Sequence, residues 1–137
     1  MKDQIRSLFS LLEQDPTNEE AISGLEEIVT GEESESFRSE IATYLSDGRK
    51  GLVRSGHFEA ACKVIDLELA VTQDSAVEVE LLKEQARIFE DEIYDQKSAL
   101  TQYQKALSII PGDEDLEFKV EAIQSERDNW KQIVDKF

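Results

Sequence analysis

The sequence predicts an all-α protein of about seven or eight helices, folded as antiparallel hairpins that stack on one another. Apolar side chains recur every three or four residues along most of the 137 residues. No useful stretch alternates with the two-residue period of a strand. A hydrophobic content of 39% can form a real core, and only two prolines and six glycines interrupt the helical pattern. We expect these residues to form one domain, residues 1–137, or a piece of a longer array.

Residues 76–111 form the clearest hairpin. Its apolar positions at helical spacing are Val79, Leu82, Ala86, Phe89 and Ile93, then Ala99, Tyr103, Ala106 and Ile110. Asp95 is expected to cap the second helix and Pro111 to end it. The alanines let the two backbones approach, with Phe89 and Tyr103 filling the space between them. Because such a hairpin cannot cover its own apolar face, it must stack on neighbours, as repeats do.

A resemblance follows from this second helix. Four residues have the spacing of the second-helix signature of a tetratricopeptide repeat: Ala99, Tyr103, Ala106 and Pro111. The first helix departs from the pattern, with Arg87 in place of a small residue and Glu90 in place of an aromatic. A weaker match begins at Gly56, and its Ala61 lies ~38 residues before Ala99 instead of the usual ~34. The chain therefore resembles a divergent array of this family, which implies a right-handed α-α superhelix; an ordinary helical hairpin is the alternative.

The other helices are expected in chain order. The first, residues 5–13, stops at Pro16, and a capping box of Thr17 and Glu20 opens the next, which ends at Gly31. Residues 11–28 align without gaps on residues 106–123, which suggests duplication. This alignment places residues 1–15 as the second helix of a broken repeat.

Residues 32–55 fit one long helix, in which Gly48 and Gly51 serve close packing, or two helices broken near residues 46–48. A helix over residues 58–72 follows, and a capping box of Ser75 and Glu78 opens the next one. An acidic cap at residues 112–117 opens the C-terminal part, with a turn at residues 128–129. The last short helix then carries four apolar residues that suggest self-association: Trp130, Ile133, Val134 and Phe137.

The charge balance restricts the partners. Fifteen basic and 31 acidic residues give a formal charge of −16, which disfavours nucleic acids and anionic membranes. No run approaches the ~20 apolar residues of a membrane span, so we expect no membrane insertion. Basic partners are favoured, unless the acids only solvate the surface. A single cysteine and the lack of a signal peptide make a cytoplasmic setting the default.

No pattern in the sequence predicts catalysis, a metal or a cofactor. The one histidine, His57, follows a glycine at a turn, and Cys62 lies on an apolar helix face. The acidic runs at residues 90–92 and 112–117 do not follow a calcium-binding loop. The glycines lack the strand and Lys-Ser/Thr context of a phosphate loop. We therefore expect a protein that is not an enzyme.

The candidate binding residues come from a run without acids, residues 48–57, which holds Arg49, Lys50 and Arg54. Lys50 and Arg54 are four apart and share a helix face. The resemblance places them in the inner groove, where they would receive an acidic side chain or a C-terminal carboxylate. The alternative is that they pair with acids such as Asp47 or Glu84.

The resemblance adds a second set of residues to the same groove. It comprises Leu81, Glu84, Gln85, Ile88 and Asp91, a mixed apolar and acidic face that suits a segment carrying Lys or Arg. The same residues also fit plain packing between repeats. We expect a non-catalytic adaptor or scaffold that binds a peptide or protein segment. The alternatives are a structural spacer of a larger repeat protein and a regulatory domain of an enzyme.

Overall fold

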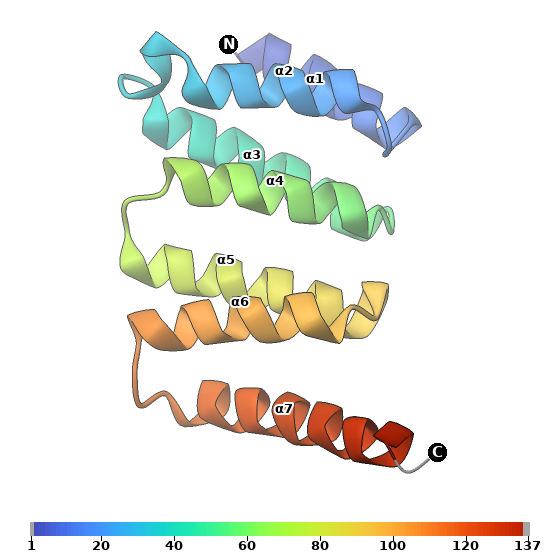
Figure 1. The fold of residues 1–137 in the computed structure, drawn as a ribbon. Helices are drawn as coiled ribbons and strands as arrows, with labels where there is room; N and C mark the ends of the chain where they lie inside the picture. Colours follow the sequence, from blue (N-terminus) through green and yellow to red (C-terminus); the bar gives the residue numbers. More distant parts are fainter. Residues whose placement is uncertain (1, 136–137) are drawn as a thin grey trace. The chain divides into compact units, whose positions relative to one another are not determined.

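The computed structural model describes the backbone of residues 2–135 and the side chains of residues 2–129. Within this part the chain is helical and has no strand (Figure 1). Its seven α-helices are α1 (Lys2–Gln14), α2 (Glu19–Thr30), α3 (Arg38–Arg54), α4 (Phe58–Val71), α5 (Ser75–Ile88), α6 (Gln96–Ile109) and α7 (Glu114–Asp135). A short 3-10 helix, η1 (Glu32–Ser34), and a π-helical turn, η2 (Phe89–Ile93), complete it. The predicted all-α class with about seven helices is confirmed, whereas the superhelix stays a prediction.

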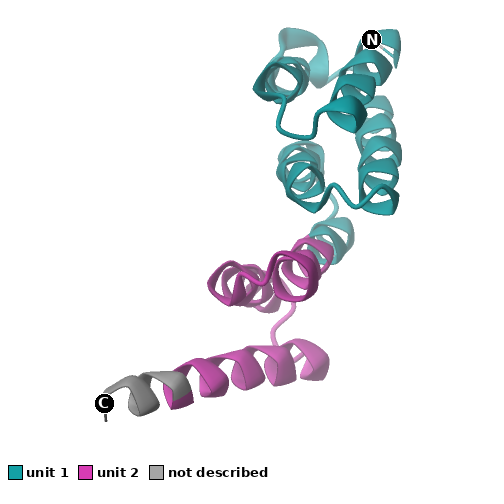
Figure 2. Ribbon diagram, turned by 90° about the vertical axis from the view of Figure 1, so that its right-hand side faces the viewer, with its two compact units in different colours: residues 1–81 teal, residues 82–137 magenta. Residues whose placement is uncertain are grey.

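The chain divides into two compact units, unit 1 (residues 1–81) and unit 2 (residues 82–137), coloured separately in Figure 2. In unit 1, α1 packs on α2 and α3 packs on α4, while α1 also lies against α3 and α2 against α4. The four helices thus form two layers, α1/α3 and α2/α4 (Figures 1 and 2). Residues 1–15 were predicted to lie in the layer opposite to residues 32–55, as the second helix of a repeat. This placement is wrong, because α1 pairs with α2 and lies in the same layer as α3.

The core of unit 1 lies between these layers and contains a close contact at Gly48. A Cβ atom on Gly48 would overlap the ring of Phe9, so only glycine lets α1 approach α3 there. Helix α3 runs without a break through residues 46–48, so the two-helix alternative is wrong. At Gly51 a Cβ atom would lie 3.4 Å from the Glu13 carboxylate, which leaves room for it. The core residues are Ile5, Phe9, Leu12, Ala21, Leu25, Val29, Ile41, Leu45, Leu52, Ala60, Ala61, Val64, Leu67 and Val71.

Two predicted capping boxes are wrong, each by one residue. The side chain of Asn18, not Thr17, accepts the Ala21 N–H at 3.0 Å and caps α2. Thr17 does not cap the helix, because its N–H and its hydroxyl both donate hydrogen bonds to the Asp15 carboxylate. At α5 the carboxylate of Asp74 accepts the Ala76 N–H at 2.9 Å, so Asp74 takes the capping place that was assigned to Ser75. In both cases the capping residue stands immediately before the first helical residue, and its short side chain reaches the first free N–H groups of the helix.

In unit 2, α6 packs against η2 and α7. Asp95 caps α6 as predicted, accepting the Ser98 N–H at 3.1 Å and its hydroxyl at 2.7 Å. Helix α6 ends at Ile109, just before Pro111. The predicted turn at residues 128–129 is wrong, because α7 continues to Asp135 through a stretch with no proline or glycine to stop it. The four apolar side chains predicted for self-association, from Trp130 onward, lie outside the described side chains.

No helix in the described part of the chain has the length and apolar character that a bilayer crossing requires.

Candidate functional site

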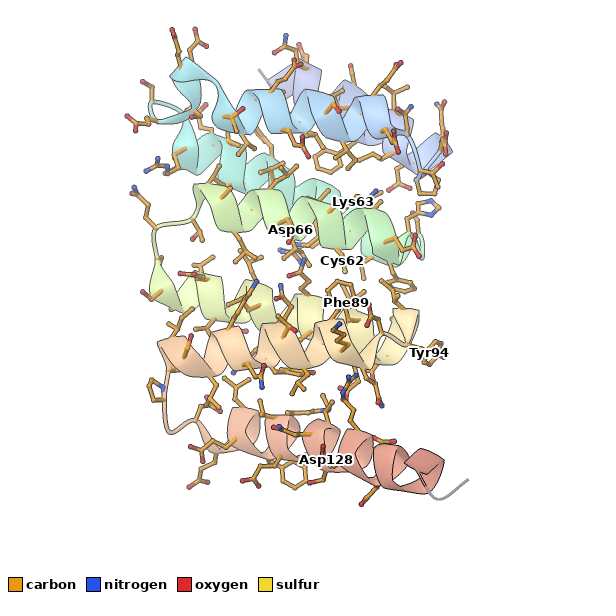
Figure 3. All side chains as sticks on the ribbon, in the orientation of Figure 1. Cys62, Lys63, Asp66, Phe89, Tyr94 and Asp128 are labelled. Atoms are coloured by element: carbon orange, nitrogen blue, oxygen red, sulfur yellow. The ribbon has the colours of Figure 1, made fainter. Side chains whose placement is uncertain are left out.

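The two layers of unit 1 carry opposite charge. Helices α1 and α3 together hold six basic and four acidic residues, a net charge of +2. Helices α2 and α4 hold one basic residue, Lys63 (Figure 3), and seven acidic ones, a net charge of −6. Since the whole chain carries −16, the α1/α3 layer is a local exception. An electrostatic difference between two faces of one small unit selects the orientation in which a charged partner approaches.

The three predicted cations of α3 divide into two kinds. The side chain of Arg49 is partly buried, and its Nε lies 2.7 Å from the Glu68 carboxylate of α4. It also donates to Ser46 at 3.3 Å. Lys50 and Arg54 are exposed and form no ion pair with any described side chain. Within unit 1, the alternative that they pair with Asp47 is therefore not observed, and Arg49 joins α3 to α4 instead. The alternative that they pair with Glu84, a residue of unit 2, stays a prediction.

Burial raises the pKa of Glu68 above its ordinary value, and the hydrogen bond and charge of Arg49 oppose this rise. The charge of Lys50 acts in the same direction as Arg49, more weakly. Glu68 is only 4% exposed, so its carboxylate depends on Arg49 for compensation of its lost hydration. Arg49 therefore stabilises the contact between α3 and α4, whereas Lys50 and Arg54 are exposed to solvent.

A hollow of about 670 Å³ lies between α1 and α3. Its apolar floor is formed by Ile5 and Phe9, and Tyr44 lies on the α3 side. Charged groups surround this floor, with Lys2 and Arg6 among them. The remaining lining residues are Ser10, Glu13, Gln14, Asp47 and Gly48. The sequence reasoning missed this hollow because it placed residues 1–15 in the other layer; the amphipathic pattern of α1 with Lys2 and Arg6 was the available signal.

Contacts near the C-terminal end of α1 fix the register of the two helices. The Glu13 carboxylate accepts the Ser55 hydroxyl at 2.8 Å and lies 3.8 Å from His57 Nε2. Together with the contact between Phe9 and Gly48, this shows that α1 and α3 run side by side in the same direction. His57 lies at the turn before α4, as predicted, and its ring neighbours Glu13. The hollow therefore lies on a fixed pair of helices.

The second predicted set is mostly buried. Leu81, Gln85 and Ile88 are each exposed by 7% or less, and the Gln102 side-chain amide donates a hydrogen bond to Gln85. Glu84 is partly exposed and accepts a hydrogen bond from Arg87 at 2.8 Å. Asp91 is exposed. Only Glu84 and Asp91 present polar groups to solvent, and the groove predicted to join this set with Lys50 and Arg54 stays a prediction.

Cys62 is buried and is not part of a disulfide, as its apolar helix face predicts (Figure 3). Among the described residues, no group of three or more His, Cys, Asp or Glu side chains is arranged to hold a metal ion.

Comparison with known proteins adds no family assignment. No protein-family model, no curated protein and no solved structure matches the chain.

Proposed function

We propose that this chain is a protein-binding module whose α1/α3 layer receives an acidic, partly apolar segment of another protein. It would serve as an adaptor in a divergent tetratricopeptide-like array, in the cytoplasm. The observation that supports the proposal most directly is that this layer, in a chain of −16, still has a net charge of +1 when Arg49, which pairs with Glu68, is left out. A strongly acidic chain repels acidic segments except where cations gather on one face.

Lys50 and Arg54 provide this attraction. Both are exposed, and neither forms an ion pair with a described side chain. Their spacing of four residues places both head groups on one side of α3, within reach of one carboxylate or two successive ones. On α1, Lys2 and Arg6 repeat the same four-residue spacing beside the hollow. Helices α1 and α3 therefore each carry two basic residues that are four positions apart.

The hollow provides the apolar part of the recognition. Ile5 and Phe9 are buried beneath it, so the partly exposed ring of Tyr44 offers most of the apolar contact to a Leu- or Phe-sized side chain, and about 670 Å³ is enough to receive one. Apolar burial would supply affinity, while the cations would set the association rate and the choice of partner. A plain structural spacer would need neither the hollow nor the cations.

Direct binding of labelled synthetic peptides tests the proposal. An extended peptide of alternating Glu and Leu/Phe should bind, whereas the same peptide with Lys in place of Glu should not bind to the α1/α3 layer. We expect the double variant Lys50→Glu/Arg54→Glu to weaken the acidic peptide about tenfold, equivalent to about 1.4 kcal/mol. Fluorescence anisotropy at two salt concentrations measures this affinity.

The matched control is Lys97→Glu/Lys105→Glu, which makes the same charge change on two exposed lysines of α6. It should leave the affinity within about twofold, because neither lysine belongs to the α1/α3 layer. If both double variants weaken binding equally, only net charge acts and the proposed site is wrong. If the acidic peptide does not bind the unmodified protein, the spacer alternative is preferred.

A further inference from the structure

A second hollow lies between α1 and α2, and it differs from the proposed acidic-segment site in its lining. Its volume is about 560 Å³, and its floor is formed by Leu8, Gly24 and Ile28. A Cβ atom on Gly24 would lie 2.8 Å from a Leu8 methyl group, so this glycine lets the two helices cross closely. The floor side chains are partly exposed. On α1, Leu11 extends the apolar strip by one turn and is 42% exposed.

The rim of this hollow is acidic and polar. Asp3 and Glu27 line it together with Gln4 and Ser7, and no basic residue is among its lining residues. Both carboxylates are exposed, and neither forms an ion pair with a described side chain. Helix α2 itself carries four glutamates and no basic residue. The apolar floor is thus flanked on both helices by uncompensated negative charge.

We propose that the α1/α2 hollow binds an amphipathic helix of another protein that carries Lys or Arg beside its apolar stripe. A helix laid along the hollow places residues three and four apart over Leu8, Ile28 and Leu11. Basic residues that flank this stripe meet Asp3 on one helix and Glu27 on the other. The floor supplies contact area and the two carboxylates select the charge of the ligand.

Charge also argues against insertion of the exposed Phe118 of a second copy into this hollow. A second copy brings −16, and its exposed Phe118 has Glu117 and Glu121 near it on the same helix. Placing those glutamates against Asp3 and Glu27 sets like charges opposite each other, which costs free energy. A basic helix places Lys or Arg against Asp3 and Glu27, so the electrostatic interaction is attractive. This second proposal does not depend on the first.

Two synthetic 18-residue amphipathic helices with the same leucine stripe test the proposal, one with lysines on its polar face and one with glutamates. We expect the lysine helix to bind, with NMR shift changes concentrated in α1 and α2, and the glutamate helix not to bind. Asp3→Lys/Glu27→Lys should weaken binding about tenfold. Glu32→Lys/Glu33→Lys makes the same charge change on exposed residues of η1 and should alter the affinity less than about twofold.

The apolar contact is tested separately. Leu11→Gln should weaken the lysine helix about three- to fivefold, because it removes exposed apolar area without disturbing the core. Val77→Gln, a change at a residue that is 45% exposed and outside the hollow, should have no effect. Equal weakening by the η1 variant would overturn the proposal, as would binding of the glutamate helix. A dimer in sedimentation that Leu11→Gln abolishes would show a second copy as the occupant and would also overturn it.

Discussion

Both units hold the two helices of a hairpin together with a buried polar pair, but the pairs differ in charge. In unit 1, Arg49 of α3 and Glu68 of α4 form an ion pair at 2.7 Å. In unit 2, the amides of Gln85 in α5 and Gln102 in α6 form an uncharged hydrogen bond. Among the described side chains, no buried nitrogen or oxygen lacks a hydrogen-bond partner. The two helices of a hairpin are thus joined by charged groups in unit 1 and by amides in unit 2. Burial costs the charged groups much more free energy of hydration than it costs the amides.

Removal of one charged side chain of the Arg49–Glu68 pair should have the largest effect on the free energy of unfolding. Arg49→Met should destabilise the protein by about 3–5 kcal/mol, because it leaves the Glu68 carboxylate buried without a partner. Arg49→Met/Glu68→Leu should recover most of this loss, because no unpaired charge then remains. Urea denaturation monitored by circular dichroism measures both. If the single and double variants are equally unstable, the pair acts through packing and not through charge.

The close contact at Gly48 comes next and concerns the apolar packing of unit 1. Gly48→Ala should cost about 1–3 kcal/mol, because the new Cβ overlaps the ring of Phe9. Helix propensity alone predicts the opposite sign, a gain of about 1 kcal/mol. Gly51→Ala, three residues along the same helix, has room for its Cβ and should show that gain. The same denaturation measurement compares the two variants, and a gain at both positions would refute the contact.

The neutral pair of unit 2 should respond less strongly than the ion pair. Gln102→Leu should cost about 1 kcal/mol, because it removes the buried hydrogen bond that the Gln102 amide donates to Gln85. Thermal unfolding followed by calorimetry tests this. A Gln102→Leu loss as large as that of Arg49→Met would remove the difference between the charged and the neutral pair.

Much of this architecture could be predicted from local patterns. Helical spacing gives the seven helices, and Asp95 and Pro111 mark the two ends of α6 because capping and proline sterics act over a few residues. The capping boxes failed by one residue, since Asn18 and Asp74 were equally short polar side chains and local sequence does not rank them. The partner of Arg49 could not be predicted, because Glu68 comes from another helix, 19 residues later. The layer in which α1 lies could not be predicted either, because it is set by tertiary packing. The hollow beside Phe9 could therefore not be predicted, since it exists only when α1 lies beside α3.

The pH dependence of stability should separate the two pairs by a smaller but specific effect. Burial raises the pKa of Glu68 in the folded state above its ordinary value of 4.5, so the folded protein retains a proton that the unfolded chain has released. Its contribution to stability is therefore fully present below about pH 4.5 and is lost as the pH rises through the raised pKa. Each unit of that rise corresponds to about 1.4 kcal/mol. The amide pair of unit 2 does not titrate and adds no such dependence.

Urea denaturation from pH 4 to pH 8 measures the free energy of unfolding of the unmodified protein and of the Glu68→Gln variant. The value for the variant is subtracted from that for the unmodified protein at each pH, which leaves the contribution of Glu68. The difference should fall with rising pH and become constant above the raised pKa. Asp95, whose pKa is lowered by its hydrogen bonds from Ser98, acts with the opposite sign below its ordinary value of 3.8, and it is present in both proteins. It therefore cancels, as do the other carboxylates far from Glu68. A difference that is flat, or that rises with pH, would mean that Arg49 fully compensates the burial of Glu68, and the charged pair would then cost no more than the neutral one.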